Sequence, residues 1–421
     1  MWIGSSIHGF VGLQACDCKV PQSGRQGDFT LASNPLSVLA VVCLLTFLHY
    51  TAAQMRGPIL PLYAVTHGAS ATGVGLILGA HMLVAAVGSI PFGRASDVWG
   101  RRRFLLGGMI VTIGTSLLLP LAEDPLALMA IYGLAGLGVA AFTPSALSLV
   151  GDAAAPGRAG HAFAWYSTAH YGAIGVGPYL GGLAAESWGY RTAFVASAAG
   201  VAFALIVGLV VPIRAPALPT SHSGATFADI RGNAAVWSGW ILSISGLLIQ
   251  GVVFSFFPLL GHDRGLTPAA IGLVFLILGL ANTVARLPAG WLVDRTGRPA
   301  PWAIIGVLVA SVATIVLPHV GGQTLLFLLV AVLGGMSGIA FVAVGVALAS
   351  ATTPATRGLV MGGYSTCLYL GFALGSFGLG PVITQHGYAT GFAVGGIAGV
   401  IGTLIAAALW ARVGEPRSKQ S

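Results

Sequence analysis

Charged residues are scarce in this chain. Asp, Glu, Lys and Arg together make up 7% of its 421 residues, whereas soluble domains carry about 25%. Hydrophobic residues account for 56%, and the mean hydropathy is +0.89. Such a chain cannot cover a soluble surface, so we expect an integral membrane protein. Its apolar runs are long and continuous rather than alternating, which favours membrane-spanning helices over a barrel.

Motifs of catalysis and of metal binding are missing as well. The sequence contains no phosphate-binding loop, no HExxH and no nucleophile motif, so we predict that the protein is not an enzyme and uses no cofactor. No polar stretch is long enough for a nucleotide-hydrolysing domain, which excludes a primary pump. Cys16 and Cys18 have no second ligand pair, so we expect reduced thiols and no metal site.

The chain does contain a series of apolar segments of membrane-spanning length. We expect an all-α membrane fold of twelve transmembrane helices in two six-helix bundles. The segments cover residues 36–58, 72–93, 104–121, 126–149, 160–185, 192–213, 235–259, 269–291, 301–318, 324–350, 358–383 and 389–411. The expected organisation is a disordered cytoplasmic tail over 1–33, bundles over 34–213 and 235–412, a cytoplasmic linker over 214–234 and a tail over 413–421.

The distribution of positive charge predicts the orientation in the membrane. If residues 1–33 are cytoplasmic, nearly all Lys and Arg residues between the segments lie on that side. Only Arg191 and Arg264 lie on the other side, while Arg56 and Arg286 lie within segments. Cytoplasmic loops carry such an excess, so we predict a multi-pass protein of the plasma (inner) membrane with both termini in the cytoplasm. The same bias explains the net charge of +8 without a nucleic-acid partner.

A short charged turn occurs twice. The stretch "GRASDVWGRRR" over 93–103 is followed 197 positions later by "GWLVDRTGRP" over 290–299. A second echo, between 166–194 and 364–392, aligns without gaps at nearly the same separation. The pairs in the two echoes include Gly93/Gly290, Asp97/Asp294, Gly100/Gly297, Arg101/Arg298, Tyr166/Tyr364 and Tyr171/Tyr369. Two independent echoes at one spacing indicate two parallel structural repeats.

The chain has six plus six segments, a Gly-x-x-x-Asp-x-x-Gly-Arg-Arg turn after the second segment and a weaker copy of it after the eighth. In these features it resembles the major facilitator superfamily of secondary transporters. "GPYLGG" at 177–182 resembles the end of a helix-5 motif of its drug/proton antiporters, and "PILPLY" at 58–63 resembles the end of helix 1 in that branch. The helix-5 motif consists of Gly177, Pro178, Gly181 and Gly182. Ala173 replaces a glycine of this motif, and Tyr132 stands where an arginine linked to proton coupling is common.

The resemblance implies a gate built from the charged turns. Its residues are Gly93, Asp97, Gly100, Arg101, Asp152, Gly290, Asp294 and Arg298. In the family, the counterpart of Asp97 bonds across to the eleventh helix, here near Gly358, and the counterpart of Asp152 pairs with that of Arg101. Gly93 is expected to permit a close approach and Gly100 a tight turn.

The second copy of the turn is expected to form the weaker lock. Asp294 and Arg298 are predicted to contact the start of the fifth segment, but Ser350 or Ala351 stands where a second acidic partner is expected. The arginines of the first turn have an alternative role, because Arg102 and Arg103 can anchor the loop to anionic lipid.

Polar residues within the segments each have a functional and a structural interpretation. A charge there is costly, so Arg56 and Arg286 contact either substrate or a structural partner, or Arg56 reaches the outer surface. His81 and His170 lie near segment midpoints, where a histidine either carries a coupling proton or bonds a neighbouring helix. The remaining candidates are Gln54, Gln250, Asn282 and Tyr166. No carboxylate lies in mid-segment, so a proton carrier must be a histidine, an end carboxylate such as Glu186, or the substrate.

These features favour a secondary active transporter that works by alternating access. We predict proton-coupled export of a small lipophilic or amphipathic compound. The alternatives are an uptake or exchange carrier for a small organic anion and, more remotely, a membrane receptor without transport activity. The predicted partners are the small-molecule substrate, protons and the lipid bilayer, and we expect a functional monomer.

Overall fold

The structure, a computed structural model, describes residues 35–154, 158–211, 226–353 and 356–412. These residues belong to one compact unit, Ala32–Ser421. The expected N-terminal tail with its Cys16 and Cys18, most of the linker and the C-terminal tail lie outside the described residues.

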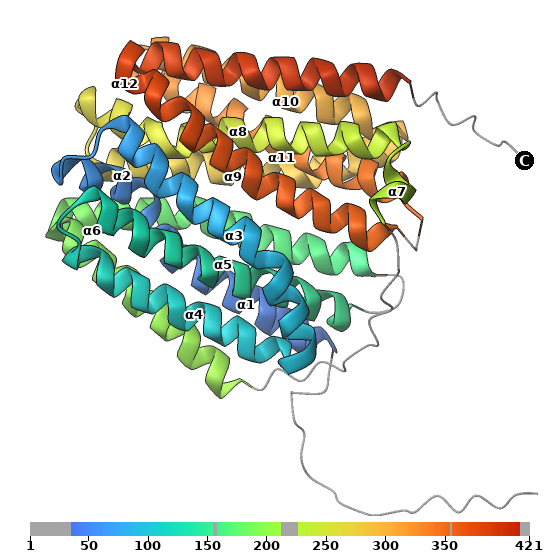
Figure 1. Ribbon diagram of the computed structural model, residues 1–421, viewed down its shortest axis with the longest axis horizontal. Helices are drawn as coiled ribbons and strands as arrows, with labels where there is room; N and C mark the ends of the chain where they lie inside the picture. Colours follow the sequence, from blue (N-terminus) through green and yellow to red (C-terminus); the bar gives the residue numbers. More distant parts are fainter. Residues whose placement is uncertain (1–34, 155–157, 212–225, 354–355, 413–421) are drawn as a thin grey trace, which may run out of the picture. The chain divides into compact units, whose positions relative to one another are not determined.

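Every regular element in the described part of the chain is helical (Figure 1). The helices are α1 (Pro35–Gln54), α2 (Arg56–Thr66), α3 (Ala71–Trp99), α4 (Arg101–Leu118), η2 (Leu119–Leu121), α5 (Pro125–Ala153), α6 (Ala159–Val210), α7 (Phe227–Ile230), α8 (Ala234–Asp263), α9 (Pro268–Thr296), α10 (Pro299–Val316), η3 (Leu317–His319), α11 (Gln323–Ser350) and α12 (Arg357–Ala411). The short helix α7 lies in the segment predicted to be a linker.

Two helices are too long for a single membrane crossing. A crossing of about 30 Å needs about 20 residues, but α6 and α12 have 52 and 55. Each is interrupted by one glycine, Gly189 at φ 82° and Gly387 at φ 81°, in the left-handed region that favours glycine. Each glycine therefore marks a kink between two helices, and α12 visibly reverses its direction (Figure 1). The ten apolar helical stretches of spanning length in the described residues therefore make twelve crossings, as predicted.

Side-chain caps define where several of these helices begin. Ser70, Asp124, Asn233 and Thr267 each accept a hydrogen bond from the backbone N–H three residues further on. Such caps satisfy backbone donors that have no partner within the helix. The polar residues between apolar segments therefore determine the helix starts as well as the loops.

The helices pack as two halves that follow the sequence repeat. In the first half, α1 to α6, the main contacts are α1 with α6 and α3 with α5; in the second half, α8 to α12, they are α8 with α12 and α9 with α11. The paired glycines Gly177 and Gly375 have equivalent places. A Cβ at Gly177 would meet the carbonyl oxygen of Thr51 in α1, and one at Gly375 that of Leu248 in α8. The repeat seen in the sequence is thus a repeat of helix contacts.

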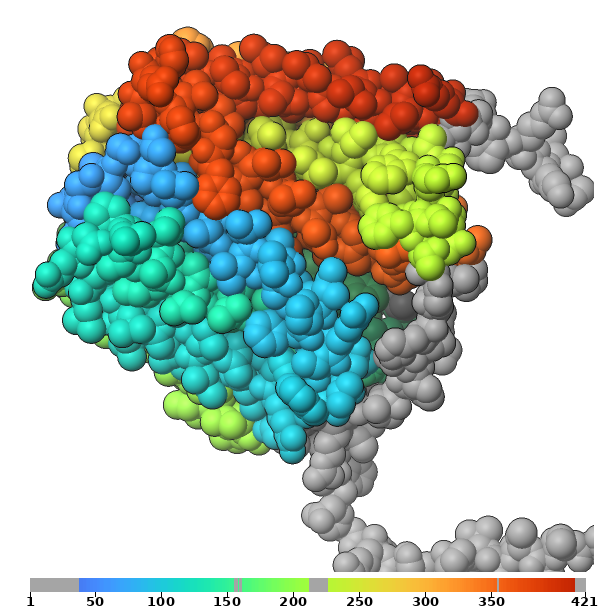
Figure 2. Space-filling view, in the orientation of Figure 1, coloured from blue at the N-terminus to red at the C-terminus, as the bar shows by residue number. Residues whose placement is uncertain are grey.

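The two halves meet at one end of the helices and separate at the other. We call the end with the turns at Gly100 and Gly297 the arginine end, and the end with Gly189 and Gly387 the opposite end. At the opposite end, α3 contacts α12, α6 contacts α9 and α2 contacts α8. Toward the arginine end, a recess separates the surfaces of α3 and α12 (Figure 2).

The space around glycines of α3 and α12 shows how closely the two halves approach at each end. A Cβ at Gly75 of α3 would clash with the backbone of Ser376, and one at Gly380 with that of Thr72. Nearer the arginine end, a Cβ at Gly93 would make only an ordinary contact of 3.6 Å within the first half. In this arrangement a Cβ at Gly93 would meet no described residue of the second half within 4 Å.

Candidate functional site

A cluster of aromatic and polar side chains lies near the middle of the helices where the two halves face each other. It contains residues of α1, α6, α9 and α12, with Phe142 and Thr143 of α5 beside it. We call the following set the central cluster: His49, Tyr50, Tyr166, His170, Tyr171, Asn282, Arg286, Tyr364 and Tyr369.

Helix α6 organises the aromatic part of this cluster. Tyr166 and His170 are one helical turn apart, so their rings lie on the same face and stack with centroids 6.0 Å apart. The ring of Tyr50 meets His170 edge-on at 4.2 Å, and the Tyr50 hydroxyl is 2.5 Å from the Thr143 hydroxyl. From the second half, Tyr369 interacts with the side chains of Thr143 and Ser89. The cluster therefore joins helices of both halves.

Arg286 is the cation of the central cluster. Its guanidinium lies 3.6 Å from the centroid of the Tyr171 ring, across the boundary between the halves. Its Nε donates to Oδ1 of Asn282, one turn earlier in α9, at 3.0 Å. No salt bridge to Arg286 occurs among the described residues. A cation–π contact and one amide thus hold this charge, for which the described part of the chain offers no counter-ion.

Several polar atoms of the cluster are buried without a hydrogen-bond partner. Six such side-chain atoms occur in the described residues, and four of them belong to the cluster: His49 Nδ1, Tyr166 OH, His170 Nδ1 and Arg286 Nη2. An unsatisfied buried polar group costs about 1–3 kcal/mol. Their concentration at one place marks a site suited to a polar ligand or to water.

Arg56 and His81 form a separate cluster inside the first half. Arg56 is only 3% exposed, so it does not reach the outer surface. Its Nε donates to the Ala53 carbonyl at 3.1 Å, its Nη1 lies 3.4 Å from the Thr115 hydroxyl, and its guanidinium lies 5.6 Å from the Tyr132 ring. His81 stacks on Tyr132 at 4.3 Å. The position where the resemblance expects an arginine therefore has a guanidinium beside it, supplied by α2.

The first charged turn assembles its predicted partners within the first half. Arg101 donates from Nε to Asp97 at 3.1 Å, and its Nη1 bonds Asp152 and the Ser148 carbonyl. Gly100, at φ 101°, makes the tight turn. Among the described residues Asp97 has no hydrogen bond or ion pair to α12, and a Cβ at Gly358 would meet nothing within 4 Å. Arg101 thus joins Asp97 and Asp152 within the first half.

Arg102 has a definite structural contact. Its Nη2 donates to the carbonyls of Gly208 and Leu209, at 3.0 and 2.9 Å, where α6 ends. A cation at a helix C-terminus is favourable. Arg102 therefore fastens the α3–α4 turn to α6, a role additional to the predicted contact with lipid.

The second charged turn has a different set of contacts. Gly297 adopts φ 62°, which matches the turn at Gly100. Asp294 is exposed and has no salt bridge in the described ranges, and a Cβ at Gly290 would meet nothing within 4 Å. Arg298 lies at the start of α10, and its neighbour Arg295 stacks over Trp291 at 5.0 Å. The acid–arginine pair of the first turn is thus not repeated by Asp294.

The helix-5 motif packs α6 against both halves. Gly177 and Gly181 abut the backbone carbonyls of Thr51 and Met55, while Gly182 abuts that of Pro268 at the start of α9. Pro178 is buried within α6. One turn beyond Gly182, the Glu186 carboxylate accepts a hydrogen bond from the Ala269 N–H at 3.0 Å. The motif therefore lies in the contact that closes the opposite end.

The remaining sequence candidates divide between the cluster and helix packing. Asn282, Tyr166, His170 and Arg286 come together, whereas Gln54 packs against Gly177 and the neighbour of Gln250, Gly251, packs against Phe372. Sequence reasoning did not select His49, Tyr50, Tyr171 or Tyr369. The repeat offered a signal for two of them, because Tyr171 and Tyr369 are equivalent positions.

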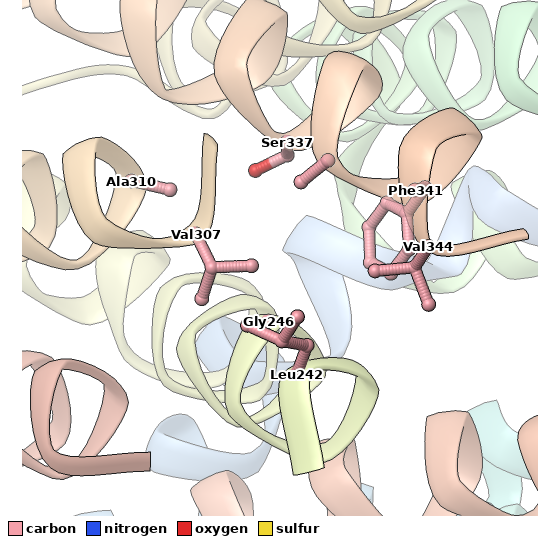
Figure 3. A pocket seen from close by; sticks show the side chains of 8 residues that line it. Leu242, Gly246, Val307, Ala310, Ser337, Phe341 and Val344 are labelled. Carbon is pink, nitrogen blue, oxygen red and sulfur yellow. The ribbon is translucent and has the colours of Figure 1, made fainter. Parts of the chain in front are cut away.

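Two cavities elsewhere do not provide a comparable site. One, of about 10 Å³, lies between α8, α10 and α11 (Figure 3) and is lined by Leu242, Gly246, Val307, Ala310, Ser337, Ala340, Phe341 and Val344. Its volume suffices for about one water molecule. A groove of about 370 Å³ runs between α8 and α12 and is lined mainly by aliphatic side chains. No group of three metal-binding side chains occurs in the described residues.

Comparison with known proteins agrees with this architecture. The family model described as Major Facilitator Superfamily matches residues 42–267 and 241–421. An uncharacterised MFS-type transporter of Methanocaldococcus jannaschii is 22% identical over 356 residues, covering 81% of this chain and 89% of that protein. The multidrug efflux protein YfmO of Bacillus subtilis is 26% identical over 384 residues, covering 89% and 93%.

A solved structure shares the fold. It is that of a bacterial homologue of the human lysosomal transporter Spinster in an inward-facing and unoccupied conformation. The TM-score is 0.73 at 19% identity, with 90% of this chain and 96% of that chain covered.

Proposed function

Because the chain belongs to the major facilitator superfamily, and is a membrane transporter rather than an enzyme, we propose that it exports a small lipophilic or amphipathic compound by alternating access with protons as the coupling ion. The central cluster is the proposed substrate site. The observation that supports it best is the group of four unpartnered polar atoms among aromatic rings at the boundary between the halves. The relative named as a multidrug efflux protein supports the direction of transport.

The proposed cycle alternates which end of the helices is open. The halves are closed at the opposite end by the α3–α12 and α6–α9 contacts and apart at the arginine end. The excess of positive charge at the arginine end favours a cytoplasmic location of that end, in the plasma (inner) membrane. The structure then corresponds to a transporter open to the cytoplasm, and a monomer contains all of the proposed machinery.

The proposed proton carrier is a histidine of the central cluster. The described carboxylates lie at or near helix ends or between helices, Asp97, Asp152, Glu186 and Asp294 among them. His170 lies within the cluster, in contact with Tyr50, Tyr166 and Tyr171. An imidazole can take up and release a proton, and His170 is the one in ring contact with three tyrosines of the proposed substrate site. We therefore assign to His170 the role of linking substrate and proton.

The proposed gate closes when Asp97 reaches the start of α12. In the present arrangement Arg101 holds Asp97 and Asp152 together on the first half. When the arginine end closes, we expect Asp97 to dock near Gly358. We also expect Asp294 and Arg298 to approach the start of α6. The glycines at 93 and 290 leave room for this approach.

Everted membrane vesicles with an acidic lumen test the export proposal. A panel of lipophilic drugs and organic acids is added, and a pH-sensitive dye reports collapse of the gradient. We expect a lipophilic compound to release the gradient and Asp97→Asn to lower the initial rate about tenfold, which corresponds to about 1.4 kcal/mol. Vesicles without the protein measure passive permeation.

Asp124→Asn is the matched control for Asp97→Asn. It makes the same chemical change at an N-cap of α5, where asparagine caps as well as aspartate, so the rate should not change. If no compound of the panel releases the gradient, proton-coupled export is wrong.

A second candidate function is uptake or exchange of a small organic anion. The observation that favours it is Arg286, which has no carboxylate partner among the described residues. Counterflow of a labelled organic acid without any change in the pH gradient would support this function over export.

A further inference from the structure

We propose that the central cluster selects an amphipathic monocarboxylate: an acidic headgroup bound by Arg286 and an aromatic body held among the rings of Tyr50, Tyr166 and Tyr171. The inference rests on the proposed use of this cluster as the substrate site and names the chemical class of that substrate.

The net positive charge of the central cluster favours an anionic ligand. Arg286 brings one positive charge to the cluster, and in the described residues neither a salt bridge nor a cluster carboxylate balances it. Burial without a counter-ion is unfavourable for any charge. An anionic ligand supplies the missing counter-ion, whereas a cationic ligand adds a second uncompensated charge.

The surroundings of the Arg286 guanidinium favour a carboxylate as the anionic group. One face is covered by the Tyr171 ring at 3.6 Å, and Nε is occupied by Asn282. Nη2 is buried and has no partner. The guanidinium is thus held in place on two sides and keeps a donor for a ligand, and a carboxylate is the acceptor that fits such a donor.

The neighbouring groups match the remainder of an amphipathic acid. The Tyr166 hydroxyl and His170 Nδ1 are buried and unpartnered, so each offers a further hydrogen bond to a polar headgroup. The ring of His170 meets that of Tyr50 edge-on at 4.2 Å and stacks on that of Tyr166 at 6.0 Å. Aromatic surfaces in these orientations bind flat apolar groups well. An aromatic carboxylate therefore satisfies both parts of the site.

The test compares three probes that share one ring system and differ in charge. Binding of 1-naphthoate, 1-naphthalenemethanol and 1-naphthylmethylammonium to the purified full chain in lipid nanodiscs is measured by calorimetry near neutral pH. A charge-assisted hydrogen bond contributes enough for a roughly ten- to hundredfold preference. We expect 1-naphthoate to bind more tightly than the alcohol and the ammonium by this factor.

Variants of two arginines in α9 identify the group responsible. Arg286→Gln should remove the preference for the carboxylate and leave binding of the alcohol almost unchanged. Arg295→Gln is the matched control, because Arg295 is in the same helix and also stacks on a ring, that of Trp291, but is exposed outside the cluster. It should keep the full preference.

The outcomes separate this inference from the export proposal. Binding of 1-naphthoate no tighter than that of the alcohol overturns the inference, even if Arg286→Gln does not fold, because this comparison uses the unmodified chain. An unchanged preference in Arg286→Gln also overturns it. If the alcohol or the ammonium is exported in the vesicle assay while 1-naphthoate does not bind, export stands and the anionic substrate falls; if 1-naphthoate binds through Arg286 but nothing is exported, the reverse holds.

Discussion

Arg56 and Arg286 show how two arginines within a membrane bundle differ in their surroundings. Arg56 is enclosed in one half, with a carbonyl, a hydroxyl and the Tyr132 ring around it. Arg286 lies between the halves and keeps Nη2 unpartnered. The charge of Arg56 is held by fixed partners within one half, whereas the open donor of Arg286 at the boundary is available to a ligand. The two residues therefore require different experiments.

Substitution of Tyr132 tests the structural role of Arg56. Tyr132→Leu removes the ring that contacts both Arg56 and His81, and we expect a loss of about 1–2 kcal/mol of stability. Tyr132→Phe keeps the ring and serves as the control, with a smaller loss. Thermal unfolding of the purified variants measures the difference. Equal melting temperatures for the Leu and Phe variants would contradict the role assigned to the ring.

Asp229 gives a pH prediction outside the membrane-spanning segments. The Thr226 N–H and then the Thr226 hydroxyl bond its carboxylate, and these bonds lower the pKa of Asp229 below 3.8. The capping box at the start of α7 is therefore kept above that pKa and lost as the pH falls through the lowered value. Carboxyl ¹³C NMR should show this pKa, and Thr226→Ala should raise it toward 3.8. Thr356→Ala, at the start of α12, should leave it unchanged.

For single residues, the sequence predicted which side chains belong to the candidate site better than it predicted which of them contact one another. It selected His170, Arg286, Asn282 and Tyr166 separately, because each is a polar group inside an apolar run. Their assembly depends on the contact of α6 with α9, between helices of different halves, which no local pattern encodes. For Arg56 the sequence left open a substrate, a structural partner and the outer surface. Its neighbours Tyr132 and Thr115 come from helices that no local pattern connects to it.

Within each half, pairs of helices pack closely because glycines allow their backbones to touch. Gly177 and Gly375 lie in equivalent places and bring α6 onto α1 and α12 onto α8. A methyl group at either position has no space, because the neighbouring atom is a backbone carbonyl that cannot rotate away. The contact is therefore sensitive to a change of one carbon atom.

Gly177→Ala and Gly375→Ala should each destabilise the protein by about 1–3 kcal/mol, as overpacking does. Thermal unfolding in detergent measures the effect. Gly114→Ala is the matched control, since Gly114 lies inside α4 with open space around it; there alanine should stabilise the helix by about 0.5–1 kcal/mol. A similar melting temperature for all three variants would show that the close contacts do not limit stability.

The twelve crossings could be predicted because the thickness of the membrane imposes a minimum length on every apolar segment. The very short turns at Gly189, between the fifth and sixth segments, and at Gly387, between the eleventh and twelfth, could not be predicted, because both glycines look like ordinary loop residues. The separation of the halves at the arginine end could not be predicted from the sequence either. Asp97, Arg101 and Asp152 are the same residues whether the halves are together or apart at the arginine end.

For the whole molecule, the closed opposite end offers a direct test of alternating access. The Thr72 and Thr384 hydroxyls are 2.9 Å apart across the boundary of the halves. A disulfide between Thr72→Cys and Thr384→Cys, in a background without other cysteines, should hold that end closed and stop transport. A reductant should restore it.

Each single cysteine variant is the control for this disulfide and should transport with or without oxidant. Continued transport by the oxidised double variant would show that the opposite end does not have to open.

The isolated charge of Arg286 has an electrical consequence. If the halves move as proposed, an empty transporter carries this charge through part of the membrane field, whereas one loaded with a monocarboxylate moves as a neutral pair. A full elementary charge crossing 100 mV corresponds to about 2.3 kcal/mol. The return of the empty protein, and not the loaded step, would then be the voltage-dependent half of the cycle.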